Sequence, residues 1–114
     1  MNNRENAPAL PESTVDIIKQ TLQLYSVTQR PNQVAEVVVF DSNTQLIGAV
    51  DLRDQKQPQS VNRSTAEQMM WPLATIVEAS QSMGQEPRFA RINYRVGEII
   101  IIPHEKYNIS VRIN

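Results

Sequence analysis

The chain of 114 residues contains no cysteine, which excludes disulfide bonds, thiol catalysis and cysteine-ligated zinc or iron–sulfur sites. Its one histidine, His104, stands in a polar segment and fits a solvated turn better than a metal site or a catalytic base. The three glycines, Gly48, Gly84 and Gly97, are too scattered to form a phosphate-binding loop. We therefore expect a protein that is not an enzyme and holds no cofactor.

Long hydrophobic runs and a strong net charge are also missing. The longest apolar run, Ile99–Ile102, is far shorter than the roughly 20 residues of a membrane span. The net charge of -1 gives no general attraction to nucleic acid or to an anionic membrane. The first residues lack the apolar region of a secretory signal. These absences predict a cytoplasmic protein with no nucleic-acid partner and no membrane insertion.

The overall composition, 40% apolar and 20% charged residues, is that of one ordinary globular domain. Residues 1–10 are polar and contain prolines, and we expect them to be a disordered leader before a single domain over residues 11–114. Ser13 and Asp16 have the spacing of a helix cap, and an apolar stripe with helical spacing follows them. The first element of the domain is therefore predicted to be a helix.

Two β-rich runs follow, Val34–Phe40 and Leu46–Leu52, with the polar turn Asp41–Gln45 between them. This pattern is typical of an antiparallel hairpin. The first run is apolar on both faces, which indicates a strand inside the sheet. Asp51 and Asp54 follow at the exit of the hairpin, where a solvated loop is the better interpretation than a cation site.

A second helix is predicted after the polar loop 53–62. Ser64 and Glu67 have the spacing of a capping box, apolar residues continue at helical spacing to Met83, and Gly84 is suited to end the helix. Pro72 lies inside this pattern, where a proline costs ~3 kcal/mol of helix stability. Either the helix kinks there, or a short first turn ends near Trp71 and Pro72 begins the main helix.

The remainder of the chain alternates as β-strands do. Arg88–Val96, Ile99–Ile102 and Tyr107–Ile113 read as a three-stranded meander, with turns at 97–98 and 103–106. The predicted fold is thus of the α/β (α+β) class, with a five-stranded antiparallel sheet and flanking helices in the order α-β-β-α-β-β-β.

Three segments in this order resemble the roadblock/dynein light chain family over about residues 12–114. They are the short helix before "VAEVVVFDSNTQLIGAVDL", the long helix over residues 64–83 and the final meander "ARINYRVGEIIIIPHEKYNISVRIN". Two positions depart from the family: Asn43 stands where a glycine is usual in the first turn, and Pro72 is unusual in the central helix.

The resemblance implies a five-stranded antiparallel sheet with helices beside it and a homodimer. The second helix and the strand after it would form the two-fold interface of that dimer. The implied role is a non-catalytic scaffold, a motor-complex adaptor or a regulator of a small Ras-like GTPase. Profilin-like and PAS-like domains share such a sheet, and they favour the alternative of a small-ligand sensor, which needs a pocket with a few polar groups.

The second helix has more apolar surface than one sheet face can cover. Its residues divide into a set that could face the sheet (Ala66, Met70, Leu73 and Val77) and a set that could meet a second helix (Met69, Ile76 and Met83). Trp71 fits either the core or an interface. Together with strand residues that the resemblance places at the two-fold axis, the candidate dimer interface comprises Met69, Trp71, Ile76, Met83, Arg88, Ala90 and Ile92.

Basic residues gather in the last quarter of the sequence. Residues 88–114 carry five basic and two acidic side chains, a net charge of +3, whereas the rest of the chain carries -4. Arg91 and Arg95 share one face of the predicted strand. They fit protection of a sheet edge against aggregation, an acidic partner surface or, less well, nucleic acid. Arg91 and Arg95 are therefore the candidate partner-binding residues.

Overall fold

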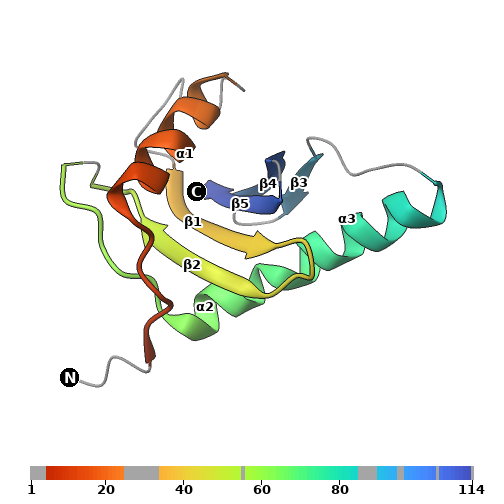
Figure 1. The fold of residues 1–114 in the computed structure, drawn as a ribbon, viewed down its shortest axis with the longest axis horizontal. Helices are drawn as coiled ribbons and strands as arrows, with labels where there is room; N and C mark the ends of the chain where they lie inside the picture. Colours follow the sequence, from red (N-terminus) through yellow and green to blue (C-terminus); the bar gives the residue numbers. More distant parts are fainter. Residues whose placement is uncertain are drawn as a thin grey trace.

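The computed structural model describes residues 5–24, 34–54, 56–84, 90–94, 97–104 and 106–113, the strand β3 by its backbone alone. The elements, in chain order, are α1 (Glu12–Leu24), β1 (Val34–Asp41), β2 (Leu46–Asp51), α2 (Arg63–Gln68), α3 (Met70–Ser82), β3 (Ala90–Tyr94), β4 (Gly97–His104) and β5 (Tyr107–Ile113). Figure 1 shows the helices around one sheet. The predicted α+β class and the antiparallel sheet are confirmed.

The sheet has the strand order β2-β1-β5-β4-β3, and every neighbouring pair is antiparallel. The predicted hairpin is present as β1 and β2, with Val38 paired to Ala49. β1 also pairs with β5, so it lies inside the sheet, as its two apolar faces indicate. β3 is the last strand of the described sheet on the side opposite β2.

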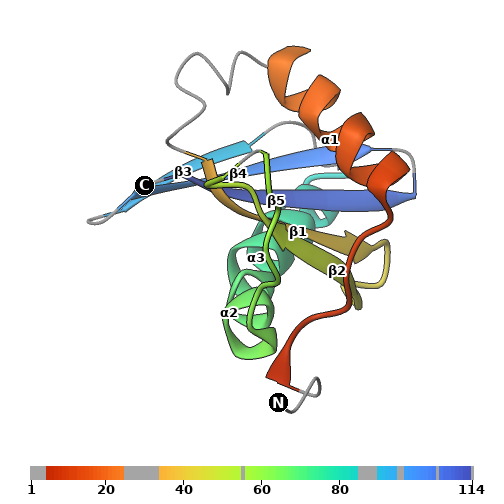
Figure 2. The ribbon, with the colours of Figure 1, turned by 90° about the vertical axis from the view of Figure 1, so that its left-hand side faces the viewer.

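Helices cover both faces of the sheet (Figure 2). On one face, Val15 and Ile18 of α1 pack on alternate strand residues such as Val37 and Val39. On the other face, α2, α3 and Met69 between them pack on the intervening strand residues, such as Val38. The period-two alternation of strand side chains therefore divides one sheet into two hydrophobic cores.

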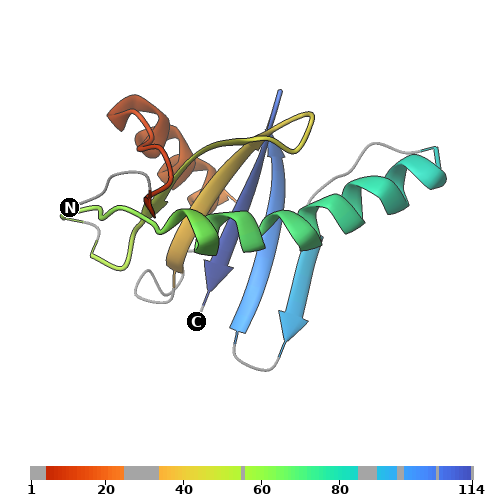
Figure 3. The same cartoon turned by 90° about the horizontal axis from the view of Figure 1, so that it is seen from below.

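The second predicted helix is divided into α2 and α3 by a turn at Met69, and Figure 3 shows the two pieces running end to end across the sheet. Pro72 is the third residue of α3. The first four amide groups of a helix have no acceptor within it, so a proline costs little there. Of the two interpretations at Pro72, a short first segment followed by the main helix is the nearer one, but the break is at Met69 and not near Trp71, and the main helix begins at Met70 and not at Pro72.

Three predicted boundaries are wrong by one or two residues. α1 begins at Glu12, before Ser13. α2 is capped by Asn62, whose side-chain oxygen accepts from the Ser64 amide at 2.9 Å, so Ser64 is not the cap. Gly97 already pairs with Tyr94 inside β4 and does not form the turn. Local side chains compete as caps, and the sequence alone does not rank them.

The N-terminal arm (residues 5–10) differs from the expected disordered leader. It runs along the outer edge of β2, where the Ala49 amide donates to the Pro8 carbonyl at 3.0 Å. Ala7 is buried, and its amide donates to the Val61 carbonyl at 2.8 Å. The arm therefore belongs to the folded domain. Short pairings of this kind form between segments far apart in the sequence, so composition does not reveal them.

Candidate functional site

Helix α3 projects past the sheet, and its second half lies beyond β3 in Figures 1 and 3. Only Leu73 of its thirteen residues is buried, although the helix is rich in apolar and small residues. Met83, which follows the helix, is 68% exposed. A helix that is apolar on several sides is normally buried on several sides, so α3 carries apolar surface that its own sheet does not cover.

That surface forms a stripe along one flank of α3. Successive helix residues are about 100° apart, so side chains spaced four, three and four residues apart share one side. Pro72, Ile76, Ala79 and Met83 have this spacing. Pro72 and Ile76 are half-buried, whereas Ala79 and Met83 are exposed. We call these four residues the α3 stripe. Its 4-3-4 spacing is that of the seam between two packed helices.

The structure separates the predicted interface residues. Ile76 and Met83 lie on the α3 stripe. Met69 does not: it is 3% exposed and packs in the core against the sheet, so its assignment to the interface is wrong. Trp71 is 70% exposed, which decides against the core. It lies roughly 80–140° around the helix from the stripe residues, among polar side chains such as Thr75 and Glu78.

The strand candidates are described only in part. Ala90, Arg91 and Ile92 belong to β3, where their backbones pair with Ile101, Ile100 and Ile99 of β4. β3 is thus at the sheet edge beside which α3 projects, as Figure 3 shows. Arg88 and Arg95 lie outside the described residues. The arginine candidates therefore remain predictions, with the backbone of Arg91 at the edge of the sheet.

Two carboxylates and two guanidinium groups meet on the side of the sheet away from β3. They lie on the face that α2 and α3 cover. Glu36 of β1 is opposite both Asp51 of β2 and Arg112 of β5. Arg112 makes a bidentate contact with the buried Glu36 carboxylate, to which its Nε and Nη2 atoms both donate. Arg53 makes a similar contact to Asp51, with its Nε 3.0 Å from Oδ2. Opposite charges thus satisfy each other in two pairs.

Asp51 shows the electrostatic consequence. Burial by itself would raise the pKa of Asp51, but hydrogen bonds from the side chain and amide of Arg53 and the charges of Arg53 and Arg112 outweigh it. The pKa of Asp51 is therefore lowered from its usual 3.8. The Asp51 carboxylate is therefore paired with Arg53. The described residues contain no cluster of acids or histidine that could hold a metal ion.

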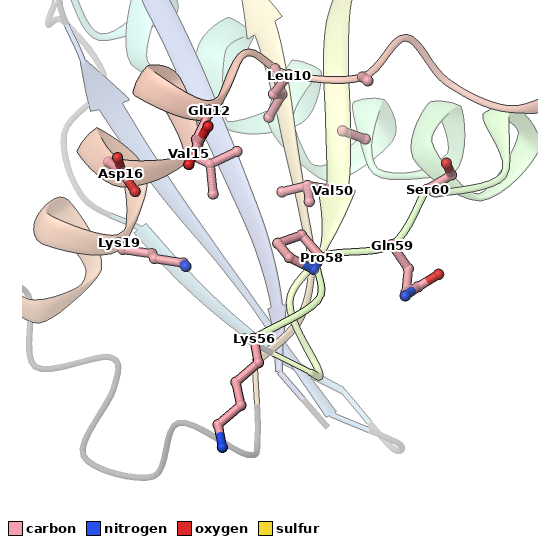
Figure 4. A pocket seen from close by; sticks show the side chains of 12 residues that line it. Leu10, Glu12, Val15, Asp16, Lys19, Val50, Lys56, Pro58, Gln59 and Ser60 are labelled. Atoms are coloured by element: carbon pink, nitrogen blue, oxygen red, sulfur yellow. The ribbon is translucent and has the colours of Figure 1, made fainter.

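A pocket of about 370 Å³ lies between the N-terminal arm, α1 and the loop after β2 (Figure 4). Leu10, Val15, Val50 and Pro58 give it apolar walls. Its polar lining comes from both charge signs and from neutral groups: Glu12, Asp16, Lys19, Lys56, Gln59 and Ser60. The pocket depends on how the arm lies on β2.

Two features of the site were missed by sequence reasoning. Pro72 and Ala79 complete the α3 stripe, and their spacing from Ile76 was a readable signal. The ion pairs of Glu36 and Asp51 depend on which strands become neighbours, and no local signal identifies them.

No helix in the described part of the chain is long and apolar enough to cross a membrane.

Comparison with known protein families and with curated proteins finds no match for this chain. The resemblance to the roadblock family thus rests on the order and character of the segments alone.

Proposed function

We propose that the chain is a non-catalytic homodimeric scaffold or regulatory protein of roadblock-like architecture, and that it dimerises through the α3 stripe. The observation that carries this proposal is the contrast within α3: one buried residue, Leu73, in a helix with an exposed apolar flank. Two copies of the stripe packed across a two-fold axis would remove this surface from water. Each Å² of apolar surface so buried contributes about 25 cal/mol.

The position of the stripe also supports a two-fold contact. An isologous interface uses the same patch on both copies, so it requires a self-complementary surface. Ile76 and Met83 can pack against their counterparts, while Ala79 allows the helices to approach closely. The edge strand β3 lies beside the projecting helix (Figure 3), as the family's mode of dimerisation requires.

The partner of such a dimer follows from the resemblance alone. A small Ras-like GTPase is the candidate, with Arg91 and Arg95 as contacts for an acidic surface. Complementary charge at such a contact acts mainly on the association rate and weakens with salt.

The deciding experiment is sedimentation of the whole chain at micromolar concentrations. The double variant Ala79→Glu with Met83→Glu places two carboxylates on the exposed half of the stripe, where burial without a partner is costly. We expect the wild type to sediment at twice the 13.0 kDa of one chain and the variant at that single mass, with the helical circular dichroism unchanged.

Thr75→Glu with Ser82→Glu is the matched control, because it adds the same charge to the exposed outer face of the same helix. This variant is expected to remain a dimer. A wild-type chain that sediments at 13.0 kDa throughout would contradict the proposal, and so would equal dissociation of both double variants.

The alternative of a small-ligand sensor is favoured by the pocket between the arm and α1, which combines apolar walls with Lys19 and Lys56. A thermal-shift screen of small metabolites separates the two functions. A ligand that stabilises the wild type and fails to stabilise Ser60→Arg would support the sensor, since Ser60 lines the pocket at an exposed position and the arginine would fill it.

A further inference from the structure

The chain's own N-terminal arm lies against the outer edge of β2 at Ala49 and against residues 61–62 of the loop before α2. The Ala49 amide donates to the Pro8 carbonyl at 3.0 Å, and the Ala7 amide donates to the Val61 carbonyl at 2.8 Å beside the antiparallel bridge of Asn6 with Asn62. Further along the same edge, Asp51 pairs with Gln59. An extended peptide that adds to a sheet edge is recognised by main-chain hydrogen bonds of this kind.

Gly48 shapes this edge for the arm. A Cβ atom at Gly48 would lie 2.8 Å from the Leu10 Cδ2 atom and 2.8 Å from the Pro8 carbonyl oxygen. The second clash is with backbone, which a side-chain rotation cannot relieve. Leu10 uses the space so left and packs against the core beneath α1. The edge of β2 therefore has main-chain partners and a shaped position for one leucine.

The arm is weakly attached compared with the strands of the sheet. It forms two main-chain hydrogen bonds to the rest of the chain, whereas β1 pairs with β5 over seven register positions. Segments with few contacts open at a lower free energy than the whole domain. Pro11 joins the arm to α1, and a proline holds the residue before it in extended conformations. In an opened arm, Pro11 would therefore still favour an extended backbone at Leu10.

We propose that the outer edge of β2 is a peptide-binding site through which two copies of this chain exchange their N-terminal arms. The occupant is the arm of a second copy because that arm carries the same residues and can form the same contacts as the arm seen on the edge. Exchange of identical elements is a low-cost route to association. The net charge of -1 adds little repulsion between copies.

This contact is separate from the proposed α3 dimer. β2 and β3 are the two opposite edges of the sheet, so the arm site and the projecting helix lie on different sides. Either contact can exist without the other, and the two are tested by different readouts.

The absence of cysteine permits a specific test. Asn6→Cys and Asn62→Cys are placed in separate chains, both with Ala79→Glu and Met83→Glu so that the α3 stripe cannot bring copies together. The two chains are unfolded, mixed, refolded at high concentration and oxidised. Paired residues of an antiparallel bridge have the Cβ separation that a disulfide tolerates. We expect a covalent dimer joined through positions 6 and 62, identified by peptide mass mapping.

Two controls decide how the result is understood. One chain with both cysteines should close an internal disulfide, which shows that positions 6 and 62 meet as in the structure. An Asn62→Cys chain that also carries Gly48→Val should form the 6–62 dimer about tenfold less, because the valine clashes with the incoming arm.

An internal disulfide without any 6–62 dimer in the mixture would overturn the proposal and leave the arm as a strap within one chain. Failure of the internal disulfide would overturn it as well, because the arm would not occupy the edge. Equal cross-linking of the Gly48→Val chain would show random collision and would also contradict exchange.

Discussion

Helices α1 and α3 each have thirteen residues, yet they use them in opposite ways. α1 buries Val15, Ile18 and Thr21 against the sheet and presents a largely polar outer face. α3 buries Leu73 alone and keeps an apolar flank exposed. The buried residues of α1 are thus used by its own domain, whereas α3 leaves apolar surface for the dimer contact that we propose.

The two faces of the sheet explain why α3 buries so little. Under α1, the central strands present apolar residues such as Val37 and Val111. On the α3 side, the same strands present polar residues, namely Glu36, Asn108, Ser110 and Arg112. The Ser110 hydroxyl is buried without a hydrogen-bond partner among the described residues. Part of this face is therefore polar, and the second half of α3 projects past the sheet (Figure 3), so α3 buries only Leu73.

The contrast between α1 and α3 is tested most strongly by truncating the single buried residue of α3. Leu73→Ala is expected to lower the free energy of unfolding by about 2–5 kcal/mol, the usual cost of a cavity at a fully buried leucine. Ile18→Ala on α1 should cost a similar amount. Urea denaturation of both variants measures this. A loss well under 1 kcal/mol for Leu73→Ala alone would show that α3 is not anchored by Leu73.

This pair of residues also shows what the sequence could predict. Helical spacing identified Ile18 and Leu73 as inward-facing, and both are fully buried. Met69 is three residues after Ala66 and four before Leu73, and all three are buried in one cluster. Helical spacing therefore also places Met69 on the inward side, and its assignment to the interface came from a wrong division of the apolar residues.

The polar side of the sheet gives the next largest effect. Asp51→Asn removes a charge-assisted contact with Arg53, whose side chain is exposed, so solvent screens the pair and the expected cost near neutral pH is about 1 kcal/mol. The folded pKa of Asp51 is lowered from 3.8, so its contribution is complete above that pH and is lost as the pH falls through the folded pKa. The difference between wild type and variant should therefore shrink below about pH 4.

Unfolding curves between neutral pH and acid measure this difference. Asp16→Asn, on the exposed face of α1, is the control and should change stability by about 0.5 kcal/mol or less. A constant gap between wild type and Asp51→Asn at all pH values would contradict the assigned ion pair.

The ion pairs could not be predicted, whereas the hairpin could. The strands β1 and β2 are adjacent in sequence, and the turn between them has a local signature, with the Asp41 side chain accepting from the Gln45 amide at 2.9 Å. Glu36 and Arg112 are 76 positions apart. Their meeting depends on β5 inserting next to β1, which follows from the packing of the whole sheet. The N-terminal arm was missed for the same reason.

A comparable effect is expected on the α1 side, where the arm extends the core through Leu10. Gly48→Ala places a Cβ atom 2.8 Å from the Pro8 carbonyl oxygen, and the arm must lift to relieve the clash. Because the arm can move, the cost should be roughly 1 kcal/mol, the low end for overpacking. Hydrogen exchange of the Ala49 amide should accelerate while exchange in β5 stays slow. Unchanged protection of Ala49 would mean that the arm does not pack as described.

The smallest effect concerns Trp71, and it sharpens the assignment of the α3 surface. Trp71→Ser should change stability by about 0.5 kcal/mol or less, because the side chain is 70% exposed. Trp71 is the only tryptophan, so its fluorescence reports one site. Dimerisation through the α3 stripe would leave Trp71 on the outer face, and its emission should stay solvent-like as the protein is concentrated through the dimerisation range. A shift to shorter wavelength with concentration would place Trp71 inside the dimer contact, as the sequence first suggested, and would move the interface from the stripe to the outer face of α3.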